Sequence, residues 1–150
     1  MVLDMENCKL CPRQCGIDRT KRTGACGAGN TLRIARAALH EWEEPCLSGT
    51  RGSGTIFFSG CTLQCCFCQN YTLSHEYFGA DITPERFSEI CFELKEQGAH
   101  NINLVSASHF LPLIIPVLKK IKPQLNLPIV FNSGGYERVE TLRELEDVVD

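Results

Sequence analysis

Four cysteines lie within eight residues of the segment GSGTIFFSGCTLQCCFCQN (52–70). Thiolates ligate both zinc and iron–sulfur clusters, and structural zinc requires four ligands, commonly from two separated C-x2-C pairs. Here Cys65 and Cys68 form one such pair and no partner pair follows. Read instead as C-x3-C-x2-C, the segment offers Cys61, Cys65 and Cys68 as ligands and leaves Cys66 aside. Three thiolates on a [4Fe–4S] cluster leave one iron open to a small molecule, which is the arrangement that catalysis requires.

A second group of cysteines lies near the N-terminus with the spacing C-x2-C-x3-C-x10-C, at Cys8, Cys11, Cys15 and Cys26. Residues 1–30 are rich in Cys, Gly, Lys and Arg and show no hydrophobic periodicity. We therefore expect bound metal to supply the folding free energy of this segment. Four thiolates suit zinc, a rubredoxin-like iron or an iron–sulfur cluster.

Three cysteines remain outside these groups. Cys91 lies on the apolar face of a predicted helix and is expected in the core. Cys66 is expected to point away from the cluster, and Cys46 is an alternative fourth ligand for the N-terminal group.

Apolar segments alternate with helical patterns from residue 52 onward. Strands are predicted at 55–59 (TIFFS), 101–106 (NINLVS) and 127–131 (LPIVF). A helix is predicted to begin at Thr83 and Pro84, as N-cap and first helical residue, and to stop at Gly98. A second helix is predicted at 109–121, with a kink or its true start near Pro116, and a third from Glu140. Residues 31–51 could form a strand or a helix.

This alternation predicts βαβ units and a parallel sheet. The expected fold class is α/β, with parallel (βα) repeats forming the N-terminal half of a partial TIM-type barrel, preceded by a small Cys-rich loop segment. The expected division is a Cys-rich metal-binding segment at 1–30, a connector at 31–51, and the first three βα units of a core at 52–150. The apolar ending VVD (148–150) suggests that the chain is truncated.

The composition and charge of the chain limit its expected partners and cellular compartment. The 150-residue chain has a net charge of −3, which argues against a general polyanion binder, although residues 1–40 carry seven basic against three acidic residues. No apolar run approaches the ~18 residues that span a bilayer, and no signal-peptide pattern opens the chain. We therefore expect a cytoplasmic protein that binds neither nucleic acid nor membrane. In the reducing cytosol, clustered cysteines indicate metal rather than disulfides.

The cysteine segment and its surroundings resemble a known superfamily. C-x3-C-x2-C with Phe67 before its third cysteine, placed after the first strand, resembles the radical S-adenosylmethionine (SAM) enzymes. The segments FFSGC and CFCQN are similar to those of pyruvate formate-lyase activating enzymes and their uncharacterised relatives. CKLCPRQCGIDR, GACGAG, HEWEEPCLSGTRGSGTIFFSGC, GAHNINLVSASH and PIVFNSGGYE extend this resemblance over essentially all of the chain.

The resemblance implies a reaction type. The open iron would chelate the methionyl amine and carboxylate of SAM, and one electron would cleave SAM to methionine and a 5′-deoxyadenosyl radical that abstracts hydrogen from a substrate. It also implies an electron donor such as flavodoxin or ferredoxin, and a substrate that is a glycyl radical enzyme or another protein. In a reductive enzyme of this kind, an electron relay favours an iron–sulfur cluster over zinc at the N-terminal cysteines.

No Ser–His–Asp set, paired carboxylates or Walker loop is present, so no catalytic side chain is predicted. Ligands of parallel α/β sheets bind at the carboxyl ends of the strands, which makes Ser106, Ser108 and Asn132 the candidate SAM-binding residues. VSASH replaces the family's Gly-Gly-Glu segment there, and His109 is expected to be a helix-start residue. The aromatic residues Phe57, Phe58, Phe67 and Tyr71 would shield the cluster. The alternative function is a non-enzymatic zinc or iron–sulfur module that binds protein or nucleic acid.

Overall fold

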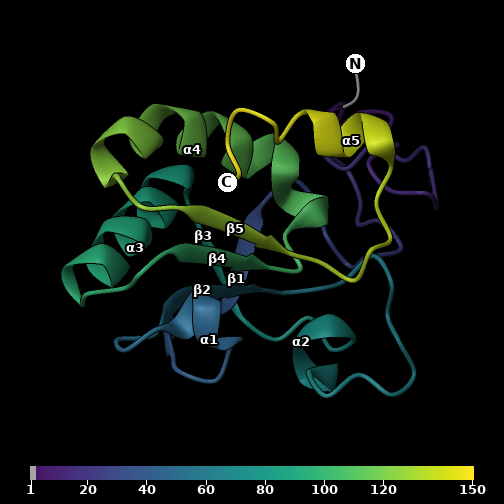
Figure 1. The fold of residues 1–150 in the computed structure, drawn as a ribbon. Helices are drawn as coiled ribbons and strands as arrows, with labels where there is room; N and C mark the ends of the chain where they lie inside the picture. Colours follow the sequence, from purple (N-terminus) through teal and green to yellow (C-terminus); the bar gives the residue numbers. More distant parts are fainter. Residues whose placement is uncertain (1–2) are drawn as a thin grey trace.

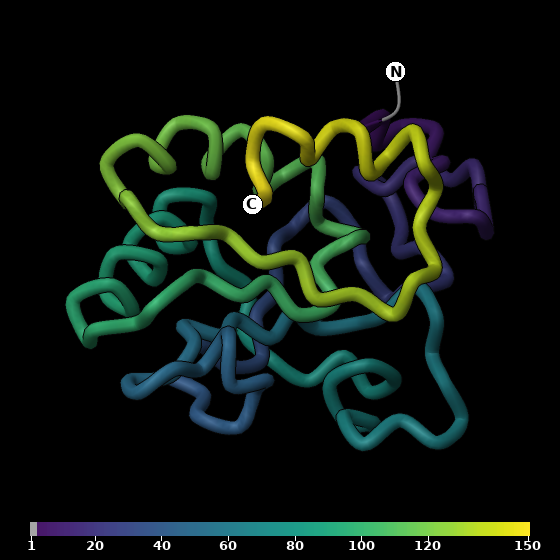
Figure 2. Tube along the Cα trace, viewed as in Figure 1, coloured from purple at the N-terminus to yellow at the C-terminus, as the bar shows by residue number. Residues whose placement is uncertain are grey.

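A computed structural model describes residues 3–150 of the chain (Figures 1 and 2). Residues 3–31 contain neither helix nor strand, as predicted for the Cys-rich loop segment. The elements that follow are β1 (Leu32–His40), α1 (Pro45–Ser48), β2 (Ser53–Phe58), α2 (Tyr71–Ser74), β3 (Ala80–Ile82), α3 (Pro84–Glu96), β4 (Ile102–Val105), the 3-10 turn η1 (Ser108–Phe110), α4 (Leu111–Leu125), β5 (Ile129–Asn132) and α5 (Val139–Arg143).

The five strands form one mixed sheet in the order β3-β1-β2-β4-β5. Only β2, β4 and β5 are parallel, whereas β1 pairs antiparallel with both β2 and β3. The prediction of parallel repeats forming half of a TIM-type barrel is therefore wrong. The physical reason for the difference lies in residues 31–51, which form β1 and α1. Strand β1 pairs with β2 without a crossover, and β3 pairs with the other edge of β1.

The two faces of the parallel strands differ in chemistry because successive side chains point to opposite sides. One face is apolar and packs against α3 and α4: Phe58 contacts the rings of Phe87 and Phe110, with centroid separations of 6.1 and 5.9 Å. The other face is polar yet buried, and includes Ser53, Thr55, Asn101 and Asn103. In Figure 1, α3 and α4 lie above β4 and β2, and α1 and α2 lie below.

The predicted strands and the first predicted helix are confirmed, with ends shifted by no more than two residues. Thr83 caps α3, since its hydroxyl accepts a hydrogen bond from the Arg86 N–H at 3.2 Å. Of the two alternatives at Pro116, the helix start is wrong, because α4 begins at Leu111 and runs through both Pro116 and Pro123. The kink stays a prediction. Burial of its apolar face, from Leu111 to Leu125, outweighs the missing backbone N–H groups.

Candidate metal centre

The carboxyl ends of the three parallel strands lie side by side. In register, Phe57 of β2 pairs with Val105 of β4, and Val105 pairs with Asn132 of β5. The loops that follow these strands therefore share one rim of the sheet, as predicted from the sequence. This rim carries the cysteine segment after β2 and the Ser106–Phe110 turn after β4.

The cysteine loop starts at Gly60, which adopts a left-handed φ of +80°. A Cβ at this position would collide with the Cys26 carbonyl, and the next residue, Cys61, donates its N–H to that carbonyl at 3.2 Å. Further along, the Cys68 N–H bonds to the Cys65 carbonyl at 3.1 Å and closes a tight turn. The loop is thus anchored at its start by the N-terminal segment and folded back on itself at its end.

Cys61 and Cys68 line one cavity of about 50 Å³ at the rim. Cys65 is partly exposed on the same loop and does not line this cavity, and Cys66 is exposed. The cavity wall is completed by residues from β2, the loop before α2, α2 itself and the end of β4: Phe57, Phe58, Gly60, Asn70, Leu73, Ser74, Val105 and Ser106.

Hydrogen-bond donors lie against the sulfurs of the two cysteines that line this cavity. The Leu63 N–H donates to Cys61 Sγ at 3.4 Å, and the Ser74 hydroxyl lies 3.4 Å from Cys68 Sγ. Ser74 is also 2.7 Å from His75 Nδ1, so it donates to the sulfur when His75 carries its proton on Nδ1. Donors of this kind stabilise thiolates and set the reduction potential of iron–sulfur clusters, and the donor set therefore fits a cluster.

The three predicted SAM-binding residues lie at the rim but differ in their surroundings. Ser106 lines the same cavity as Cys61 and adopts a left-handed φ of +58°, a strained conformation that is typical of functional sites. Asn132 lies next to it and accepts the Ser106 N–H at 2.9 Å through its carbonyl. Ser108 is buried and donates its hydroxyl to Glu137 at 2.6 Å, so it faces another side chain and does not line the cavity.

His109 holds the rim together from inside. It lies in η1, and its Nε2 donates to the Ser59 carbonyl at 2.8 Å. Burial lowers the pKa of His109 to about 4, so the ring is neutral at pH 7. The expectation that it is a helix-start residue is confirmed.

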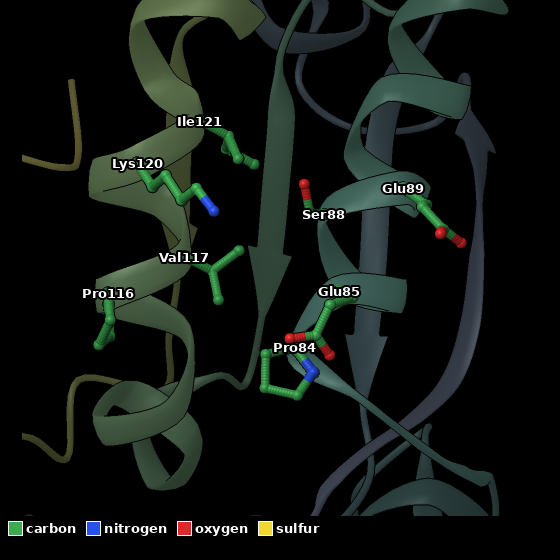
Figure 3. A pocket seen from close by; sticks show the side chains of 8 residues that line it. All are labelled: Pro84, Glu85, Ser88, Glu89, Pro116, Val117, Lys120 and Ile121. Carbon is green, nitrogen blue, oxygen red and sulfur yellow. The ribbon is translucent and has the colours of Figure 1, made fainter.

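The expected aromatic shield is only partly present. Phe57 and Phe58 line the cavity, but the Phe67 side chain is 86% exposed and Tyr71 is half exposed, stacked on His75 at 4.2 Å. A larger cavity, about 460 Å³, lies elsewhere, in a groove between α3 and α4 that contains no cysteine (Figure 3). It offers no ligand for a metal centre of thiolates.

The N-terminal cysteines form a second assembly. Cys8, Cys11, Cys15 and Cys26 all line one small cavity, and burial raises the pKa of the Cys26 thiol. Within residues 3–150, no three Cys, His, Asp or Glu side chains converge closely enough to ligate a single metal ion as they stand.

Cys46 is exposed on α1 and does not line this cavity. Cys91 is buried in the core, as predicted, and burial raises its pKa to about 12.

A family model described as "4Fe-4S single cluster domain" matches residues 48–150. The chain belongs to this family. The matched region holds Cys61, Cys65 and Cys68 and excludes the cysteines at 8–26. The expected [4Fe–4S] cofactor is thus confirmed for the domain, while its ligands stay a prediction.

One curated relative is an uncharacterized protein of Methanocaldococcus jannaschii, which is 32% identical over 153 residues and matches 97% of the chain. The chain spans less than half (44%) of the length of that relative. No solved structure matches the chain. Within the described residues, no helix is long and apolar enough to cross a membrane.

Sequence reasoning missed the residues that support the cysteine loop. Arg13 donates from Nε to the Thr62 carbonyl at 2.8 Å, and the Ser74 hydroxyl contacts Cys68. Arg13 lies in the segment CKLCPRQCGIDR, whereas Ser74 lies outside the quoted segments. Only the fold brings Arg13 to a loop some 50 positions away, so no local signal could have revealed the contact.

Proposed function

We propose that this domain belongs to a radical SAM enzyme in which Cys61, Cys65 and Cys68 hold a site-differentiated [4Fe–4S] cluster. The observation that carries the proposal is the cavity at the rim, where two cysteines of the motif lie beside the strained Ser106 and hydrogen-bond donors meet both sulfurs. The family of the chain, which is found in radical SAM-like proteins, supports the same proposal.

Each part of the rim has a task in this proposal. The three cysteines bind the cluster as thiolates, and Ser106 and Asn132 orient SAM at the end of β4 and β5. Ser108 acts indirectly, by fixing Glu137 with its hydroxyl. When bound, the cluster supplies the electron that cleaves SAM to methionine and a 5′-deoxyadenosyl radical, which abstracts hydrogen from the substrate.

The partners belong to the same proposal. A flavodoxin or ferredoxin would deliver the electron, and a glycyl radical enzyme or another protein would be the substrate. Phe67 and Tyr71 expose aromatic surface beside the cysteine loop. Exposed aromatic rings are frequent in protein interfaces, which supports a protein partner at this loop.

The test is anaerobic purification, reconstitution with iron and sulfide, and detection of 5′-deoxyadenosine by mass spectrometry after reduction with dithionite in the presence of SAM. Separate Cys61→Ala, Cys65→Ala and Cys68→Ala variants should lose the product by more than about 100-fold, since even outer-shell partners of a metal contribute 10–100-fold. Cys66→Ala is the matched control on the same loop and should retain it.

Three outcomes contradict the proposal. A protein with full iron and sulfide that never forms 5′-deoxyadenosine is not a radical SAM enzyme in this domain. Loss of the product in Cys66→Ala with retention in Cys65→Ala would show that the ligands are wrongly assigned. Zinc without iron or sulfide at Cys61, Cys65 and Cys68 after reconstitution would favour the non-enzymatic module.

A further inference from the structure

The four N-terminal cysteines are gathered around one cavity although 18 positions separate the first from the last. Cys8, Cys11, Cys15 and Cys26 line one cavity, and both Cys15 Sγ and Cys26 Sγ lie within 4 Å of the point where a Cβ on Gly24 would stand. Cys8 and Cys26 are buried in a segment without helix or strand. Cys26 also packs against the hydrophobic core, but four cysteines around one cavity are typical of a tetrathiolate ligand set.

Backbone hydrogen bonds already shape the loops that present these thiols. The first three cysteines lie on a loop whose ends are tied by the Cys8 N–H to the Ile17 carbonyl at 3.0 Å and by the Gly16 N–H to the Cys8 carbonyl at 2.9 Å. Cys26 lies in a turn closed by the Gly27 N–H to the Gly24 carbonyl at 2.9 Å. These hydrogen bonds order the backbone around the four thiols before any ion binds.

Arg19 is the second observation that points to an occupant. Its side chain lines the same cavity and is 1% exposed. Two of its nitrogens donate to the carbonyls of His109 and Gly29 at 2.5 and 2.6 Å, but Nε has no partner, and no acidic side chain within residues 3–150 pairs with Arg19. A buried cation with an orphaned donor is costly unless an anionic group lies beside it.

The choice between a single ion and a second cluster follows from the family. Four thiolates suit zinc and several other metals. The family model describes a single cluster and matches 48–150, outside these four cysteines.

We propose that Cys8, Cys11, Cys15 and Cys26 bind one structural zinc ion as a tetrahedral tetrathiolate site. Binding deprotonates the thiols and releases their protons to solvent. Four thiolates around Zn²⁺ leave two net negative charges. The guanidinium groups of Arg13 and Arg19 line the cavity and offset them. This replaces the electron relay that the sequence alone favoured.

The zinc site is placed to position the cysteine loop at 61–68. Arg13, between two of the zinc ligands, donates to the carbonyls of Thr62 and Leu63 at 2.8 and 3.5 Å. The Cys26 carbonyl accepts the Cys61 N–H at 3.2 Å. Figures 1 and 2 show the N-terminal segment at the same end of the molecule as α5, where Thr141 donates to the Leu10 carbonyl at 2.7 Å.

The experiment uses the full chain with Cys61, Cys65 and Cys68 all changed to Ala, so that any metal must lie elsewhere. Metal and sulfide are measured after anaerobic purification and again after reconstitution with iron and sulfide. We expect about one zinc per chain and negligible iron in both states. X-ray absorption should show four sulfurs at about 2.3 Å from zinc. Further Cys46→Ala or Cys66→Ala changes are matched controls and should leave the zinc in place.

Adding Cys8→Ala and Cys11→Ala should remove the zinc. If that variant does not fold, the X-ray absorption of the parent still decides, since it requires no N-terminal substitution. Iron at this site, with or without sulfide, would overturn the zinc assignment, and so would the absence of any metal or a zinc with nitrogen or oxygen ligands. These results are independent of 5′-deoxyadenosine formation by the wild-type protein, so the two proposals can fail separately.

Discussion

Gly60 lies where the two cysteine-bearing loops touch, and we predict that Gly60→Ala separates them. The residue adopts φ +80°, and an added Cβ would meet the Cys26 carbonyl and stand 2.9 Å from Tyr77 Cε2. This steric clash can be relieved only if the backbone of one of the two loops moves. Such movement would also break the hydrogen bond from Cys61 N–H to the Cys26 carbonyl.

The magnitude follows from two contributions. A left-handed conformation costs a residue with a Cβ about 1–2 kcal/mol, and overpacking against a fixed neighbour costs about 1–3 kcal/mol more. We therefore expect Gly60→Ala to lower the free energy of unfolding by about 2–5 kcal/mol. At about 2–4 °C per kcal/mol for a chain of this size, the unfolding midpoint should fall by roughly 4–20 °C.

Gly135→Ala is the matched control. Gly135 has φ +75°, but an added Cβ there meets nothing within 4 Å, so only the conformational cost applies. The assay is thermal unfolding followed by circular dichroism, with both variants and the wild type in the same metal state. Equal midpoints for Gly60→Ala and Gly135→Ala would refute the idea that the loops meet at this glycine.

Three further predictions concern single side chains. Ser74→Ala removes the hydroxyl beside Cys68 Sγ and should lower the cluster potential by up to about 60 mV, the equivalent of about 1.4 kcal/mol; an unchanged potential in an electron paramagnetic resonance titration would contradict this. The folded pKa of His109 is about 4, below its ordinary 6.5, so its contribution to stability is present above pH 6.5 and is lost as the pH falls from 6.5 to 4. It amounts to about 3 kcal/mol, and urea unfolding of His109→Gln should show a correspondingly flatter pH profile than the wild type; parallel profiles would argue against a buried neutral ring. Thr83→Ala removes the cap of α3 and should lower the free energy of unfolding by about 1 kcal/mol, whereas Thr83→Ser should restore most of it; chemical unfolding that fails to separate the two variants would exclude the capping role.

Local signals were sufficient for the elements on which the rim depends. The apolar run at 55–59 predicts a buried strand, and the Thr83–Pro84 pair predicts a helix start. Both elements are present in the structure. Residues 31–51 carry no such signal, since their apolar pattern suits a strand or a helix. Pairing with β2 and β3 makes part of this segment the strand β1, and it gives the sheet its antiparallel half. That half is what made the barrel prediction wrong.

The candidate site, too, could be predicted only in part from the sequence. Cysteine spacing alone separated Cys61, Cys65 and Cys68 from Cys66. Two of the three, Cys61 and Cys68, line the cavity, Cys65 does not, and Cys66 is exposed. The choice of metal at the N-terminal cysteines could not be predicted, because four thiolates suit several metals. The unpaired Nε of Arg19 indicates an anionic occupant, and this buried position arises only when Arg19 folds against His109.

The hydrogen bond between the Cys61 N–H and the Cys26 carbonyl joins the two cysteine sets directly. If occupancy of one site orders this bond and thereby raises the affinity of the other by some factor, the second must raise the affinity of the first by the same factor. A cell starved of zinc would then contain a chain that retains iron poorly, although every iron ligand is intact.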